Sequence, residues 1–209
     1  MSMTIRLMRR TILSATVAVS LLASAASNAI PISADSLGLT QGDPDIQSNF
    51  LDFSYDVGTG AFDIQSAFGG AQYTFAGASE NILNSGFSIT GNADGSDANL
   101  HLEITGEVSS IGGGQQILLS GDLASFSSTG NGVFEFLFGG LSGAFASIFG
   151  DYAGVIFTDG ELQNFNFSSD FSSSMGDSDT FSVPVPEPAG FGLLVLAMTS
   201  FGMYRRRTA

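Results

Sequence analysis

The stretch Leu100-His101-Leu102-Glu103-Ile104 decides the fold class, because it alternates strictly between aliphatic and polar side chains. Successive side chains of a β-strand point to opposite faces of the sheet. A period of two therefore places the three aliphatic residues on one face and His101 and Glu103 on the other. We expect a half-buried strand here, with the histidine exposed to solvent.

Similar short runs recur along the chain, and turn-forming Gly and Asn residues separate them. We interpret residues 50–57, 62–64, 73–75, 87–89, 117–119, 133–138, 155–157 and 165–167 as further strands. About ten short strands at this spacing predict an all-β fold, either an antiparallel β-sandwich or a flattened barrel. The segment 141–149 differs, because its apolar residues have helical spacing, and we expect either a short helix or a loop packed on the core.

The charge distribution excludes several classes of function. All six basic residues of the 209-residue chain lie near its ends, whereas all 20 acidic residues lie between Asp35 and Glu187. A nucleic-acid-binding surface needs cations to displace the counterions of phosphate groups, and phosphoryl transfer needs cations or a metal. Both functions are therefore excluded for the central region. The chain has no Cys, so disulfides, zinc–thiolate sites and cysteine nucleophiles are excluded as well.

The N-terminal segment 1–29 has the features of a secretory signal peptide. Three arginines (Arg6, Arg9 and Arg10) precede a run of apolar and small residues from position 11 to 26. Ser27-Asn28-Ala29 then supplies the small–x–small pattern that signal peptidase cleaves. We expect cleavage to leave Ile30 as the new N-terminus.

The C-terminal segment 184–209 combines three features in a fixed order. Pro186-Glu187-Pro188 is followed by an apolar stretch at 189–204 and then by Arg205, Arg206 and Arg207. The prolines favour an extended arm. The apolar stretch is near the minimum length of a transmembrane helix, and the arginines would stop its transfer and stay on the cytoplasmic side.

This order resembles the PEP-CTERM sorting signal, with Pro186, Glu187 and Pro188 as the sorting motif. The resemblance covers about the last 25 residues and implies processing by an exosortase in bacteria that produce exopolysaccharide. It also implies a path from an inner-membrane-anchored intermediate to the cell surface or the extracellular matrix. The implied partners are signal peptidase, the exosortase-type enzyme, the membrane before processing, and the exopolysaccharide.

The two signals divide the chain into four parts. Between the signal peptide (1–29) and the sorting signal (184–209), we expect a β-rich extracytoplasmic domain at 30–167. Residues 168–183 are rich in Ser and Asp. This composition is typical of a flexible stalk or of a loosely held last hairpin.

Calcium is the cofactor that the sequence favours most, although weakly. Asn92, Asp94 and Asp97 supply side-chain oxygens in a loop with Gly95, and oxygen ligands of this kind suit Ca²⁺. The loop departs from the helix–loop–helix motif, because Gly95 comes too early and Glu103, at the twelfth place, lies in an expected strand. An acidic turn without metal is the alternative interpretation.

No catalytic residues are assigned from the sequence. A serine triad would have to use His101, the single histidine, and the nearest approach to a nucleophile elbow, Gly140-Leu141-Ser142-Gly143-Ala144, lacks the required second Gly position. A glycosidase needs two carboxylates about 5–10 Å apart. The candidates are Glu103, Glu107, Glu135 and Glu161, and no spacing singles out a pair among them.

We therefore expect an exported, non-enzymatic surface or matrix protein with a structural or binding role. Two alternatives remain from other classes of protein. One is a secreted polysaccharide-active hydrolase that uses paired carboxylates, and the other is a calcium-dependent adhesion or carbohydrate-binding module.

Overall fold

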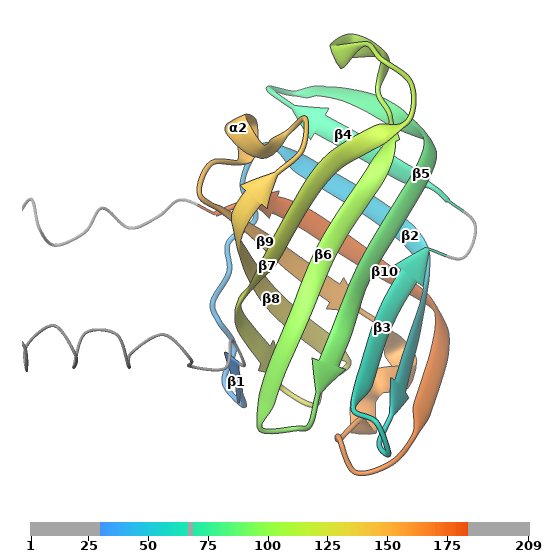
Figure 1. Cartoon of the computed structure of the whole chain (residues 1–209), viewed down its shortest axis with the longest axis vertical. Coiled ribbons are helices and arrows are strands. Elements are labelled where there is room, and N and C mark those ends of the chain that lie inside the picture. Colours follow the sequence, from blue (N-terminus) through green and yellow to red (C-terminus); the bar gives the residue numbers. More distant parts are fainter. Residues whose placement is uncertain (1–29, 67–68, 184–209) are drawn as a thin grey trace, which may run out of the picture.

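Ten strands form one sheet in the computed structural model, which describes residues 30–66 and 69–183 (Figure 1). The strands are β1 (Ile30–Ser33), β2 (Asp45–Asp56), β3 (Ala61–Ser66), β4 (Ala71–Phe75), β5 (Ala78–Ala93), β6 (Asp97–Glu107), β7 (Gln116–Ser128), β8 (Val133–Ser142), β9 (Tyr152–Thr158) and β10 (Phe171–Ser182). The short helices are α2 (Ala146–Phe149) and the 3₁₀ helices η1 (Ser109–Ile111) and η2 (Gly160–Asn164). The prediction of an all-β fold with about ten strands is confirmed.

The sheet closes on itself. Neighbouring strands follow the order β6-β7-β8-β9-β10-β2-β3-β5, and β5 pairs in turn with β6 from Leu83↔Glu107 to Ala93↔Ala98. β3 and β4 both lie between β2 and β5. β3 pairs with the second half of β2 and β4 with its first half, and the two strands likewise pair with different parts of β5. The strands in front and those behind are therefore parts of one continuous sheet, with β5, β6 and β7 in front of β8, β9 and β10 in Figure 1.

Strand β1 lies between the ends of β6 and β7. Its first two residues pair antiparallel with Ala98 and Asp97 of β6, and its last two pair parallel with Phe126 and Ser127 of β7. The direct pairing of β6 with β7 begins at His101↔Asp122. These two residues therefore lie where the two strands separate to admit β1.

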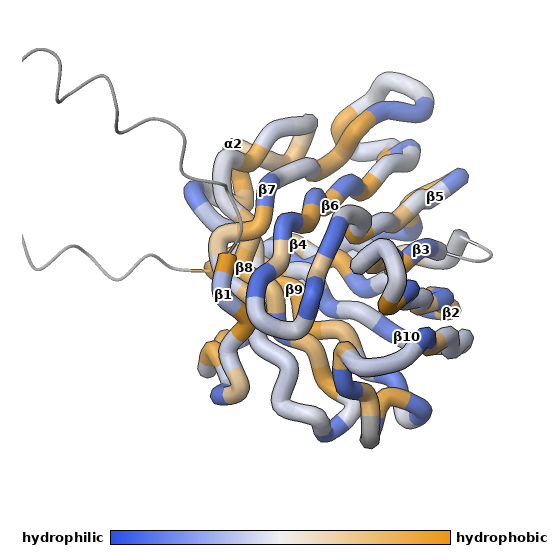
Figure 2. Tube along the Cα trace, turned by 60° about the horizontal axis from the view of Figure 1, so that its bottom comes forward, coloured by the Kyte–Doolittle hydropathy of each residue, from blue (hydrophilic) through white to orange (hydrophobic). Residues whose placement is uncertain are grey.

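The interior is filled mainly by aromatic and aliphatic side chains from alternate strand positions, and Figure 2 shows this alternation of hydropathy along the strands. Phe134 of β8 is 2% exposed and lies at its centre. Its ring centroid is 5.4–5.7 Å from those of Phe53, Phe62, Phe126 and Phe165, mostly in edge or tilted geometry. Such geometry is favourable for aromatic pairs.

The Ser- and Asp-rich segment 168–183 is not a stalk. It contains β10, which pairs with β9 on one side and β2 on the other, so the β domain extends to the end of this segment. Most of its inward positions are small (Ser173, Gly176, Ser178 and Thr180), because rings from other strands occupy the space. Phe171 at its start is the exception and packs against Phe53 and Phe165. A Cβ at Gly176 would lie 2.5 Å from the Phe157 ring.

Two other segments differ in detail from the sequence prediction. Residues 165–167, expected as a strand, follow η2 without strand pairing, and Phe165 packs into the core from this loop. Segment 141–149 contains the end of β8 and then the single-turn helix α2, so the short-helix interpretation is confirmed. Phe145 and Phe149 are its buried residues.

The expected signal peptide (1–29) and sorting signal (184–209) lie outside the described residues. Within residues 30–66 and 69–183, no helix combines the length and the apolar character needed to cross a membrane.

Replacing Phe134 with Ala tests the importance of the aromatic core. Removing a buried ring from a close-packed interior should lower the free energy of unfolding by about 3–5 kcal/mol. The matched control is Phe75→Ala, because Phe75 is 42% exposed. Urea unfolding of both variants should show a large loss for Phe134→Ala and a much smaller one for Phe75→Ala. Equal losses would contradict this account of the core.

Candidate functional site

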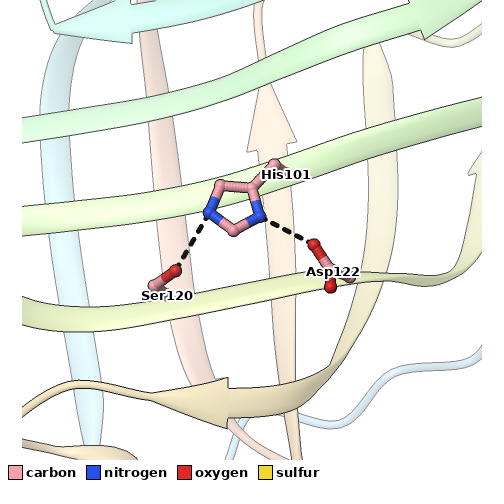
Figure 3. A network of polar contacts seen from close by, with 3 residues as sticks. All are labelled: His101, Ser120 and Asp122. Carbon is pink, nitrogen blue, oxygen red and sulfur yellow. Dashed lines mark hydrogen bonds and ion pairs between the residues drawn. The ribbon is translucent and has the colours of Figure 1, made fainter.

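A hydrogen-bonded chain of three side chains lies on the outer face of β6 and β7 (Figure 3). His101 Nδ1 is 2.8 Å from Asp122 Oδ1, and His101 Nε2 is 3.0 Å from Ser120 Oγ. The register explains the arrangement, because His101 is directly opposite Asp122 and Ser120 is two residues earlier on the same strand. Residues two apart on a strand share a face.

The hydrogen bonds define the protonation pattern of the neutral imidazole. An ionised carboxylate only accepts hydrogen bonds, so Nδ1 carries the proton and donates it to Asp122. Nε2 is then the acceptor, and the Ser120 hydroxyl donates to it. The order carboxylate–imidazole–hydroxyl is the one found in serine triads.

The three groups differ in their access to solvent. Ser120 is 7% exposed, whereas the side chains of His101 and Asp122 are 49% and 85% exposed. The Ser120 hydroxyl is therefore largely shielded from solvent, whereas the imidazole that accepts its hydrogen bond is half exposed. Among residues 30–66 and 69–183, the His101–Asp122 contact is the single pairing of a basic with an acidic side chain.

Sequence reasoning placed His101 correctly on the outer face but missed its two partners. Ser120-Gly121-Asp122 carries a signal, namely a hydroxyl and a carboxylate with strand spacing. That signal becomes informative only when the register against β6 is known. Ser142 of the sequence Gly140–Ala144 is exposed and lies opposite Ser120 on β8.

The expected calcium ligands line one shallow hollow. Asn92, Asp94 and Asp97 border a space of about 240 Å³ at the turn between β5 and β6. One oxygen of Asp94 is used locally, because Oδ1 accepts hydrogen bonds from the backbone N–H groups of Ser96 and Asp97 and from the Ser96 hydroxyl. These bonds, with the Asp97 N–H first, lower the pKa of Asp94 to about 2.

No cluster of three or more His, Asp or Glu side chains suited to a metal ion is found in the described part of the chain. A calcium site at this turn would therefore rest on Asn92, Asp94, Asp97 and backbone oxygens.

The four glutamates considered for glycoside hydrolysis do not form a pair. Glu103 and Glu107 share the outer face of β6 but are four residues apart, which corresponds to about 13 Å along a strand. Both carboxylate oxygens of Glu135 accept hydrogen bonds from the segment after β1, from Ser36 Oγ and Leu37 N. Glu161 lies in η2, where it is exposed.

A larger hollow of about 570 Å³ opens at the end of the sheet that carries the β5–β6 turn. Phe165 and Phe167 contribute rings to its lining, and Ser33, Ser96, Ser128, Thr129 and Ser168 contribute hydroxyl groups. Asp94 is its single charged lining residue among those described. A hollow of this size, lined by aromatic rings and hydroxyl groups, suits an uncharged polar ligand.

Comparisons with protein-family models, with curated proteins and with solved structures found no match. The sorting motif Pro186, Glu187 and Pro188, and the membrane stop Arg205, Arg206 and Arg207, lie outside the described residues.

One carboxylate on β2 has a strongly raised pKa. Burial, followed by the charge of Asp179 on β10, raises the pKa of Asp45 to about 6, although Gln41 and Gln47 donate weak hydrogen bonds to it. The folded state therefore binds this proton more tightly than the unfolded chain. Stability should consequently fall as the pH rises from about 4 to about 6.

The variant Asp45→Asn should remove the free-energy cost of ionising this carboxyl group in the folded state. A shift of about two pKa units corresponds to roughly 3 kcal/mol. Because Asp45 is partly solvated, screening reduces the expected gain at pH 7 to about 1 kcal/mol. Urea unfolding at fixed ionic strength should show this gain at pH 7 and its loss at pH 4. Asp52→Asn, on the exposed face of the same strand, is the control, and an equal gain from both variants at pH 7 would refute the assignment.

Proposed function

We propose that the chain is an exported cell-surface or extracellular-matrix protein, sorted by an exosortase-type system, whose closed β domain has a structural or binding role. The observation that carries this proposal is the order of the segments. An export-type N-terminus and a tail similar to PEP-CTERM flank a central region with 19 acidic residues and no Lys or Arg.

The charge of the domain supports an extracytoplasmic binding role and narrows its ligands. Outside the terminal segments, no Lys or Arg is present to neutralise a phosphate, sulfate or carboxylate on a ligand. The hollow lined by Phe165 and Phe167 offers rings and hydroxyl groups instead. Uncharged sugar units of an exopolysaccharide, which combine apolar faces with hydroxyls, fit that chemistry.

Deleting residues 184–209 tests the sorting step. The shortened chain should be released into the periplasm or the medium, because it lacks both the apolar stretch and the arginines that oppose transfer. The measurement is immunoblotting of cell fractions from an exosortase-containing host. The matched variant Pro186→Ala, Glu187→Ala, Pro188→Ala keeps the apolar stretch, so it should remain membrane-bound and unprocessed. Unchanged surface retention after the deletion would refute the proposal.

Calcium-dependent adhesion is a second candidate function, because Asn92, Asp94 and Asp97 border a common hollow. A ligand that binds only the folded state stabilises it by mass action. Low-millimolar CaCl₂ should therefore raise the melting temperature above that in NaCl of the same ionic strength. Matching the ionic strength is essential, because salt also screens the repulsion among the carboxylates.

The double variant Asp94→Asn, Asp97→Asn should abolish the calcium effect. An Asn at position 94 keeps an oxygen that can accept the turn's hydrogen bonds, so this variant changes charge more than local structure. Asp52→Asn, Asp151→Asn removes the same charge from two exposed positions elsewhere and should retain the effect. Equal melting temperatures of the unmodified protein in CaCl₂ and NaCl would exclude a calcium site.

A further inference from the structure

We propose that Ser120 is an activated nucleophile that accepts acyl groups from short, uncharged esters, with His101 as its general base and Asp122 as the residue that positions the imidazole. This activity goes beyond the proposed surface role and does not depend on where the protein is located. It rests on the hydrogen bonds that join Asp122, His101 and Ser120 on β6 and β7 (Figure 3).

The distances meet the requirement for proton transfer. A general base must lie within about 2.6–3.2 Å of the atom whose proton it removes, and the Nε2–Oγ distance is 3.0 Å. The Nδ1–Oδ1 distance of 2.8 Å fixes the tautomer that leaves Nε2 free to accept this proton. The three side chains thus have the roles of nucleophile, base and orienting carboxylate.

The backbone holds the three groups in place. Ser120 and Asp122 are on one strand, and both neighbours of that strand are paired near this point, through Glu103 and His101 of β6 and through Ser142 and Gly139 of β8. A nucleophile on a paired strand has little freedom to move away from its base. Sites built on such elements are more precise than sites on loops.

The reaction is an acyl transfer in two steps. Ser120 Oγ bonds to the ester carbonyl carbon while its proton passes to His101 Nε2. The bond from that carbon to the leaving oxygen then breaks, and the leaving group takes the proton from the imidazole. Water repeats the sequence on the acyl-serine, which releases the carboxylic acid and restores the hydroxyl.

The surroundings define the class of substrate. With 7% exposure, Ser120 admits only a small acyl group such as acetyl. Asp122 and Glu103 both lie on this face, and no Lys or Arg occurs between positions 35 and 187. Anionic esters are therefore repelled, and an uncharged ester, such as an acetylated hydroxyl of a neutral sugar, fits the site.

The test uses the purified full-length protein with p-nitrophenyl acetate as the probe. We expect release of p-nitrophenol, and peptide mass spectrometry of the trapped product should locate the acetyl group on Ser120. Ser120→Ala should abolish the release. His101→Gln should lower the acylation rate about a hundredfold, within the usual contribution of a general base.

Two further variants separate chemistry from structure. Asp122→Asn should slow acylation at least tenfold, and Asp122→Glu should restore part of the rate, because a carboxylate again accepts from Nδ1. Ser142→Ala is the matched control, because this exposed serine lies opposite Ser120, and it should react like the unmodified protein. Urea unfolding of every variant identifies any loss of rate that follows from loss of the fold.

The contrary outcomes are distinct. Unchanged p-nitrophenol release from a folded Ser120→Ala variant would show that the imidazole or another group reacts, and would overturn the proposal. Acetylation of Ser120 no faster than that of Ser142, or a folded His101→Gln variant with an unchanged rate, would show that the hydrogen bonds hold the strands together without activating the hydroxyl. Loss of sorting in the tail deletion would leave this result unaffected.

Discussion

The pairing of β5 with β6 is the constraint on which the rest of the structure depends, because it joins the two ends of the sheet. Once the sheet is closed, its inward side chains must fill a fixed volume at close-packed density. Buried rings on β2, β3, β7, β8 and β9 fill much of the interior, so little space remains for the side chains of β10. Most inward positions of β10 are accordingly Ser, Gly or Thr, as the contact between Phe157 and Gly176 illustrates.

Closure also decides where the charges lie. With the interior taken by rings, nearly all carboxylates face outward, where water and dissolved ions reduce their mutual repulsion. Asp45 shows the free-energy cost of ionisation where this solvation is incomplete. Its burial, and then the negative charge of Asp179 on the neighbouring strand, raise its pKa. His101 gives Asp122 a hydrogen-bond donor in a region of the sequence that lacks Lys and Arg.

The sequence predicted those strands whose inward residues are large. Alternation at Leu100–Ile104 and at Phe134–Phe138 identified β6 and β8 correctly, including the outward direction of His101. β10 was expected only as one of two alternatives, a loosely held last hairpin, because the polarity of Ser178 and Thr180 gives no sign that other strands have already filled the interior. Phe165 was assigned to a strand because a ring that enters the core from a loop produces the same local pattern. The site was missed for a related reason, because no local pattern contains the register between β6 and β7.

Residues distant in sequence pair with both strands next to this register. β1 lies between β6 and β7 near the His101–Asp122 pair. In the segment that follows β1, the Ser36 hydroxyl donates a hydrogen bond to Glu135 of β8. The spacing of the two strands at the site thus depends on residues about 70 to 100 positions earlier in the chain, which is why short motifs could not reveal it.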